Sequence, residues 1–143
     1  MTAEYIPSPS ERTAQQVEQY ESSNGREGTT MRGMPVVIVT MRGRKTGGIR
    51  KVPLMRVADG DNYVIVASKG GAPEHPVWYY NLIDDPDVTL RDLDVVTDRR
   101  ARLVTDPEER ARLWAVACEA YSDYEPYQQR TERQIPVFCL ERR

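Results

Sequence analysis

Short apolar runs bounded by Gly, Pro, Asn or Asp recur along the chain, and such runs are typical of strands. Val52 and Leu54 alternate with Lys51 and Pro53, as expected for a strand with one buried face. An Ala-Asp-Gly-Asp turn at 58–61 indicates a hairpin. The runs that predict strands lie at residues 35–41, 50–57, 63–68, 88–90, 95–104 and 135–140.

Helical signals stand between and before these runs. Ser8, Pro9 and Glu11 fit the cap, first position and capping-box acid of a helix of about 14 residues that runs through Val17 and Tyr20. Residues 22–33 hold three glycines and few apolar residues, which predicts a loop.

Two further helices are predicted after the third strand. Residues 76–84 form a short one, ended by Asp85-Pro86-Asp87. Asp106 caps the other, with Pro107 leading and Glu109 closing a capping box, and it runs to about Tyr121.

The order of these elements is helix, three strands, short helix, two strands, helix, strand. Tight turns cannot join parallel strands, so most pairs are antiparallel. Six short strands around one core predict a mainly β (α+β) fold, a small barrel or a strongly twisted sheet with peripheral helices. Residues 1–33 are expected to form an N-terminal helix and flexible segment, either mobile or folded over a site, ahead of a main domain at 34–143.

Composition narrows the class of protein. The chain has 143 residues, a net charge of -2 and a pI of about 5.5, which argues against a general nucleic-acid binder. Its two cysteines, Cys118 in a predicted helix and Cys139 in a predicted strand, are interpreted as buried free thiols. The polar N-terminus does not resemble a signal peptide, and no apolar run approaches the roughly 18 residues of a membrane span. A cytoplasmic enzyme or binding protein is therefore the default.

A cation cluster stands out in this mildly acidic chain. It includes a glycine-rich turn at 42–48, which allows close backbone approach to a ligand, while its charges can bind carboxylate or phosphate. The spacing matches neither a Walker loop nor a dinucleotide fingerprint. An anionic small-molecule ligand and an ordinary solvated hairpin fit the pattern equally well. The cluster comprises Arg42, Arg44, Lys45, Arg50, Lys51 and Arg56.

A second candidate site is the end of the third strand. Ser68, Lys69, Gly70 and Gly71 offer a hydroxyl, a cation and backbone donors, although a simple closing turn fits as well. His75 is the only histidine and has no evident partner, so a structural role is favoured. The sequence supports neither a zinc site nor an activated serine, and we expect no metal.

Three tyrosines recur every three residues after the last predicted helix. Tyr121, Tyr124 and Tyr127 lie in a polar segment broken by Pro126. Such rings either pack in a core or form the wall of a site, where a hydroxyl can donate to a planar ligand. The spacing does not decide between the two.

Four motifs, in the same order, resemble the deazaflavin-dependent nitroreductase family of actinobacteria, and the resemblance covers roughly Met34 to the C-terminus. The N-terminal head is less characteristic. The motifs are Val39 to Leu54 with its Arg-Gly-Arg-Lys-Thr-Gly and Val-Pro-Leu, Ala67-Ser68-Lys69-Gly70-Gly71, His75-Pro76-Val77-Trp78-Tyr79-Tyr80-Asn81-Leu82, and Arg133-Gln134-Ile135-Pro136-Val137-Phe138.

This resemblance implies a six-stranded split β-barrel, like that of flavin-mononucleotide oxidases. It also implies hydride transfer from reduced coenzyme F-420, an 8-hydroxy-5-deazaflavin, to quinones, nitroaromatics or activated enones. The anionic phosphate and polyglutamate tail of that cofactor would account for the local cations. The implied cofactor-binding residues are Arg44, Lys45, Arg50, Pro53, Leu54, Met55, Ser68, Lys69, Gly70, Trp78 and Asn81. The implied substrate-binding residues are Ser68, Tyr121, Tyr124 and Tyr127, and Ser68, Tyr124 and Tyr127 carry the implied catalytic role.

Three functions remain as hypotheses. The first is a reductase of quinones or nitro compounds that uses coenzyme F-420, and the second is a non-catalytic carrier of the deazaflavin. The third is a reductase that uses flavin mononucleotide. The tyrosines favour the first hypothesis over the second, because a carrier needs no acceptor wall. The cations favour a long anionic tail over the single phosphate of flavin mononucleotide. Peripheral membrane contact through the N-terminal segment and the oligomeric state stay open.

Overall fold

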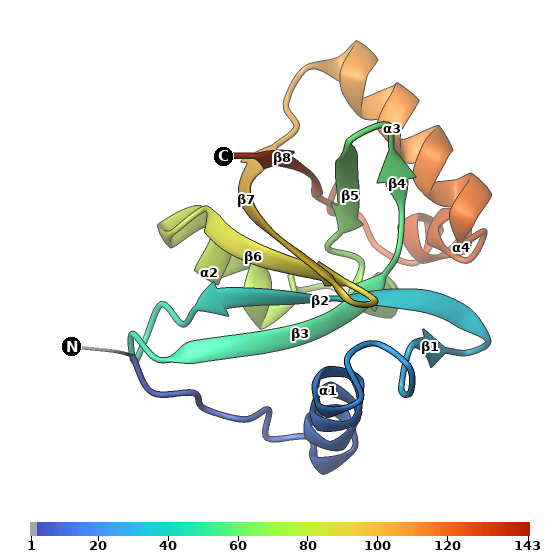
Figure 1. The fold of residues 1–143 in the computed structure, drawn as a ribbon. Coiled ribbons are helices and arrows are strands. Elements are labelled where there is room, and N and C mark those ends of the chain that lie inside the picture. The colour runs from blue at the N-terminus through green and yellow to red at the C-terminus, as the bar shows by residue number, and fades with distance from the viewer. Residues whose placement is uncertain (1–2) are drawn as a thin grey trace.

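The computed structural model describes residues 3–143, and strands within that range form one curled, antiparallel half-barrel sheet (Figure 1). Their order is β1-β2-β6-β7-β8-β5-β4, and β3 also pairs with β2. The strands are β1 (Thr30–Met31), β2 (Met34–Arg42), β3 (Ile49–Met55), β4 (Ala58–Asp59), β5 (Asn62–Val66), β6 (Asp87–Asp92), β7 (Val95–Leu103) and β8 (Val137–Arg142). The helices are α1 (Glu11–Ser22), α2 (Val77–Asp84), α3 (Pro107–Ala120) and α4 (Tyr124–Gln129), with a 3-10 turn η1 (Lys69–Gly71).

The predicted mainly β fold is confirmed, but the predicted count of six strands is wrong. The six apolar runs became β2, β3, β5, β6, β7 and β8. The two additional strands, β1 and β4, have two residues each and only extend the neighbouring hairpins. Two residues are too few to show a period, so β1 was hidden in the predicted loop at 22–33.

The sheet has apolar side chains on both faces. Along β2, Val37 and Val39 point into the interior cluster, and Val36 and Ile38 pack with α1. The interior cluster also holds Met41, Ile65, Ala67, Trp78, Leu82, Val88, Leu90, Ala101, Phe138 and Leu140. Coverage on both faces explains why β2 reads as a continuous apolar run.

The alternation predicted for β3 is only partly present, because its second face is also covered. Pro53, expected on the polar side, is buried. The N-terminal residues run alongside this strand: Ile6 N donates to Ile49 O at 2.9 Å, and Ile49 N donates to Glu4 O at 2.8 Å. α1 packs against the same strand.

α1 begins two residues later than predicted. Its cap is Ser10, whose Oγ accepts from Thr13 N at 3.3 Å, whereas Ser8 Oγ accepts from Ser10 N. The predicted Ser8 cap is therefore wrong, and the helix has 12 residues. A buried Tyr20 anchors it to the sheet.

α3 confirms the Asp106 cap, whose carboxylate accepts from Glu109 N at 2.9 Å. The other half of the predicted capping box is wrong, because the Glu109 carboxylate instead accepts two bonds from Arg102, at 2.8 and 2.9 Å. A bidentate charged pair is stronger than a bond to a backbone amide. The polar segment that holds Pro126, where no helix was predicted, forms α4, which begins at Tyr124.

α1 lies on one side of the curled sheet, and α3 and α4 lie on the other (Figure 1). Under α3 and α4, a second cluster joins the outer face of β5 and β8 to the three tyrosines. Both cysteines are free, with Cys139 buried in β8 and Cys118 half-buried in α3. None of the helices within residues 3–143 combines the length and apolar character needed to cross a membrane.

Candidate active site

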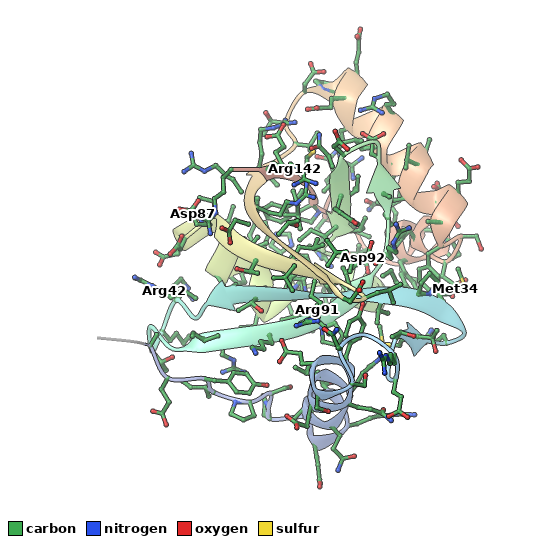
Figure 2. The ribbon with its side chains drawn as sticks, viewed as in Figure 1. Met34, Arg42, Asp87, Arg91, Asp92 and Arg142 are labelled. Carbon is green, nitrogen blue, oxygen red and sulfur yellow. The ribbon has the colours of Figure 1, made fainter. Side chains whose placement is uncertain are left out.

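The basic turn between β2 and β3 is a tight, internally bonded loop that follows Arg42 at the end of β2 (Figure 2). Gly43 N donates to Gly48 O at 2.7 Å, and Gly47 N donates to Gly43 O at 2.8 Å. Gly47 has a φ of 74°, which favours glycine. A Cβ on Gly48 would lie 2.4 Å from Ile6 Cδ1, so glycine there lets the N-terminal segment pack on the turn.

α2 holds this turn through one buried amide. The Asn81 side chain is only 6% exposed, and its Oδ1 accepts from Arg44 N at 2.9 Å. Its Nδ2 contacts Met41 Sδ at 3.6 Å. The Arg44 guanidinium lies 5.5 Å from the centroid of the Tyr80 ring, a cation–π distance. Asn81 therefore fixes the backbone of Arg44, and Tyr80 orients its charge.

A cavity of about 610 Å³ lies between this turn, α2 and the N-terminal segment. That volume is within the usual range for small-molecule sites. It gathers five of the predicted cofactor residues, Arg44, Lys45, Arg50, Trp78 and Asn81. Its other lining residues are Ser8, Pro9, Gly43, Thr46, Val52, Val77 and Tyr80.

The cations of the cluster divide into two groups. Lys51 Nζ lies 2.6 Å from Glu21, and Arg56 Nε lies 2.8 Å from Asp92, which ends β6 (Figure 2). By contrast, no carboxylate within residues 3–143 pairs with Arg42 or with the three cations that line the cavity, Arg44, Lys45 and Arg50. The cavity thus presents positive charge that the described part of the chain does not neutralise, beside an aromatic wall. This arrangement can bind an elongated anion that carries a ring.

The strand end Ala67–Ala72 forms a separate loop. Three successive residues are left-handed: Lys69 with φ 45°, Gly70 with φ 64° and Gly71 with φ 83°. Lys69 Nζ lies 3.1 Å from Glu74, in an exposed pair. The lining of the cavity does not include Ser68, Lys69 or Gly70.

All three tyrosines are buried in the outer cluster, at 9%, 5% and 9% exposure for Tyr121, Tyr124 and Tyr127. The hydroxyls of Tyr121 and Tyr127 are 3.1 Å apart, and Arg32 Nη1 donates to both, at 3.4 and 3.2 Å. Burial and the Tyr127 hydroxyl raise the pKa of Tyr121 to about 12, and burial raises the pKa of Tyr124. The hydroxyls of Tyr121 and Tyr124 therefore keep their protons at neutral pH and can donate them in hydrogen bonds.

The strand end at Ala67–Ala72 contacts α4. A Cβ on Gly71 would lie 2.6 Å from Tyr127 O, so α4 packs directly on this glycine. Ser68 and the tyrosines, predicted to share the substrate side, therefore belong to adjacent segments.

The remaining predicted cofactor residues lie in the second half of β3. Pro53 is buried, and Leu54 is half-buried against the interior cluster. Met55 packs against the cluster under α3 and α4 and against the cluster that α1 forms with β2.

Sequence reasoning missed two arginines near these segments. Arg32 gave no signal, because its tyrosine partners lie 89 and 95 residues away. Arg133 belongs to a recognised motif, but nothing in the sequence indicated its partners. It donates to the carbonyls of the strand end and contacts His75. Within residues 3–143, no group of His, Cys, Asp and Glu side chains has the arrangement of a metal site.

Comparisons with known proteins give consistent results. A family model described as F420H(2)-dependent quinone reductase matches residues 12–142. An F420H(2)-dependent quinone reductase of Mycobacterium tuberculosis strain H37Rv is 40% identical over 131 residues, which cover 87% of this chain and 85% of that one.

Two solved structures are also similar. One, described as a domain-swapped dimer, is 43% identical with a TM-score of 0.74 and covers 94% of this chain and 100% of its own. The other, an F420-H2-dependent reductase, is 49% identical with a TM-score of 0.70 and covers 75% of this chain and 94% of its own. Since the family model spans nearly the whole sequence, the chain belongs to the F420H(2)-dependent quinone reductase family.

Proposed function

We propose that this protein is an oxidoreductase that transfers a hydride from reduced coenzyme F-420 to a quinone. The observation that carries the proposal is the cavity of about 610 Å³ at the basic turn. Arg44, Lys45 and Arg50 surround it without a carboxylate partner in the described chain, which suits a cofactor with an anionic tail. Bound there, reduced coenzyme F-420 supplies the hydride, and the protein supplies position and charge.

The residues of the cavity fit this cofactor in kind. The three cations would hold its phosphate and carboxylates, and Asn81 keeps the Arg44 backbone in place. Trp78 offers an aromatic surface. We assign the head of the cofactor to the strand end with Ser68, Lys69 and Gly70, and to Pro53, Leu54 and Met55 along β3. These assignments follow the family resemblance together with the curled sheet, which supports a split-barrel arrangement.

On the acceptor side, we assign Ser68, Tyr121, Tyr124 and Tyr127. The oxygen of a quinone becomes more negative as the hydride arrives, so a neutral hydroxyl nearby stabilises the transition state and can pass on a proton. The high pKa of Tyr121 keeps such a hydroxyl protonated. Nitroaromatics and activated enones develop similar charge on oxygen, and we propose them as further acceptors.

We also propose a cytoplasmic location, with peripheral membrane contact through residues 1–33. Tyr5, which precedes the cavity-lining Ser8 and Pro9 in the sequence, is 38% exposed and offers an aromatic ring for such contact. Sedimentation with phospholipid vesicles tests this, and protein that stays in the supernatant would contradict it.

The activity is tested with purified protein, reduced coenzyme F-420 and menadione, by following the absorbance of the oxidised cofactor. We expect enzyme-dependent oxidation that requires both substrates. Tight binding of the deazaflavin without turnover would instead indicate a carrier. Turnover with reduced flavin mononucleotide alone would indicate the flavin-dependent alternative.

A further inference from the structure

The guanidinium of Arg133 makes an unusual number of bonds to one short segment. Nε donates to Ala72 O at 2.9 Å, Nη1 donates to Ala67 O at 3.2 Å, and Nη2 donates to Ser68 O at 2.8 Å. Nη1 also lies 3.0 Å from His75 Nδ1. No carboxylate within residues 3–143 forms an ion pair with this guanidinium.

The segment that Arg133 holds is strained. Lys69, Gly70 and Gly71 are all left-handed, which is unfavourable for lysine. Its own bonds are few: Gly71 N donates to Ser68 O at 2.9 Å, and Ala72 N donates to Lys69 O at 3.1 Å. The carbonyls bound by Arg133 lie before and after the strained residues. One planar, rigid group therefore fixes both ends of the turn.

We propose that Arg133 is a positioning residue for this reductase, which fixes the strand end that presents Ser68 and Lys69, and that neutral His75 holds Arg133 in place. The proposal rests on the proposed function, because Ser68 and Lys69 are assigned there to the acceptor and the cofactor. Arg133 acts through the backbone of Ala67, Ser68 and Ala72, to which its guanidinium is bonded.

The surroundings of His75 explain why its neutral form is required. Arg133 has only N–H groups, so it is the donor and His75 Nδ1 must accept. The centroid of the imidazole ring lies 4.2 Å from the centroid of the Tyr79 ring and 6.0 Å from that of the Tyr80 ring. The neighbouring Glu74 is engaged by Lys69, and Arg133 is the other charged group that faces the imidazole.

Protonation of His75 would remove the acceptor and place two cations together. Burial and the Arg133 charge lower the pKa of His75. The folded arrangement therefore favours the neutral ring, and this contribution to stability is present above the ordinary pKa of histidine. It is lost as the pH falls toward the lowered pKa. The hold on the strand end should loosen over that same acidic range.

Amide hydrogen exchange tests the hold without cofactor or turnover. In Arg133→Gln we expect the Gly71 and Ala72 amides to exchange roughly tenfold faster or more, while the Val64 and Ile65 amides of β5 keep their protection. Arg130→Gln is the matched control, because Arg130 makes one 3.3 Å bond to Gly70 O. Unchanged exchange in Arg133→Gln, or equal loosening in Arg130→Gln, would overturn the assignment.

Kinetics test the consequence for the reaction. Arg133→Gln should raise the cofactor Kd and lower kcat, each by roughly tenfold. In wild type the Kd should rise as the pH falls through the His75 pKa. His75→Asn, whose amide oxygen can accept from Arg133 but does not titrate, should flatten that rise. If the role of His75 were purely structural, the cofactor Kd would depend on pH in the same way in His75→Asn as in wild type. A pH dependence of the Kd that is equally steep in His75→Asn would therefore overturn the proposal.

These results separate the two proposals. If wild type turns over and Arg133→Gln has wild-type Kd and kcat, the positioning role falls and the reductase function stands. If wild type shows no turnover with menadione, the proposed function falls, and with it the role of Arg133 in the reaction. Hydrogen exchange would then still decide whether Arg133 holds the strand end.

Discussion

At the scale of single residues, distant partners decide which cations remain for a ligand. Lys51 and Arg56 belong to the same sequence cluster as Lys45 and Arg50, but Lys51 pairs with a glutamate 30 residues away and Arg56 with an aspartate 36 residues away. The sequence could indicate the cluster and five of the residues around the cavity. It could not separate the paired cations from the others, because the partners come from α1 and β6.

This division leads to a prediction about cofactor binding. Changing Lys45 and Arg50 together to Ala should weaken coenzyme F-420 binding by roughly tenfold or more, if each charged contact contributes about 1 kcal/mol. Raising the salt concentration should weaken wild-type binding in the same direction, because exposed charge contacts are screened. Titration of cofactor fluorescence at low and high salt measures both effects.

The control for this prediction is Lys51→Ala, a cation of the same strand that is held by Glu21. It should change the Kd little, because its charge is already neutralised within the protein. If Lys51→Ala weakened cofactor binding as much as the double variant does, or if the Kd did not change with salt, the cations without a carboxylate partner would not be the groups that hold an anionic tail.

The tyrosines allow a second test at this scale. Tyr121 and Tyr127 hydroxyls bond to each other and to Arg32, whereas no hydrogen bond within residues 3–143 involves the Tyr124 hydroxyl. Tyr124→Phe should therefore keep the free energy of unfolding within about 0.5 kcal/mol. If that hydroxyl acts in the transition state, kcat should fall while the cofactor Kd holds.

The comparison variant is Tyr127→Phe, which removes a hydroxyl with two partners and should also cost stability, by about 1 kcal/mol. Urea unfolding and steady-state kinetics of the two variants separate packing from chemistry. A Tyr124→Phe variant with wild-type kcat on quinones would show that this hydroxyl takes no part in the reaction.

At the scale of elements, the sequence predicted the features that depend on residues adjacent in the chain. The Asp106 cap and Pro107 start of α3 were read correctly, because cap and helix are adjacent in sequence. α4 was missed, since a polar hexamer containing Pro126 has little helical signal. It is stabilised instead by the burial of Tyr124 and Tyr127 against α3 and the sheet. Tertiary packing here overrides propensity.

The contact between η1 and α4 gives a prediction about elements. Gly71→Ala should destabilise the protein by about 2 kcal/mol or more, because its Cβ would lie 2.6 Å from Tyr127 O at a φ of 83°. Gly70→Ala should cost only about 1 kcal/mol, the left-handed penalty alone, because no atom lies within 4 Å of its Cβ. Urea denaturation of both variants measures the difference. Equal costs would show that α4 does not press on this turn.

At the scale of the whole molecule, the N-terminal head is joined to the sheet by buried contacts. Val17 and Tyr20 of α1 pack with Val36 and Ile38 on the outer face of β2. The Tyr20 hydroxyl donates to Val36 O at 3.0 Å and accepts from Leu93 N at 2.8 Å, so it links β2 to the β6–β7 turn. The sequence predicted a helix through Val17 and Tyr20, but not that these two side chains are buried, because the helix docks on strands that follow later in the chain.

These contacts predict that the head and the sheet unfold together. Tyr20→Phe keeps the ring but leaves the buried Val36 carbonyl and the part-buried Leu93 amide without this partner, which should cost about 1–3 kcal/mol. Because the lost bonds join both parts, we expect one cooperative urea transition, shifted to lower urea, with far-ultraviolet circular dichroism and tryptophan fluorescence coinciding. Trp78 and Trp114 lie outside the head, whereas circular dichroism also reports α1. An early loss of helical signal with unchanged fluorescence would show instead that residues 1–33 unfold as a separate unit.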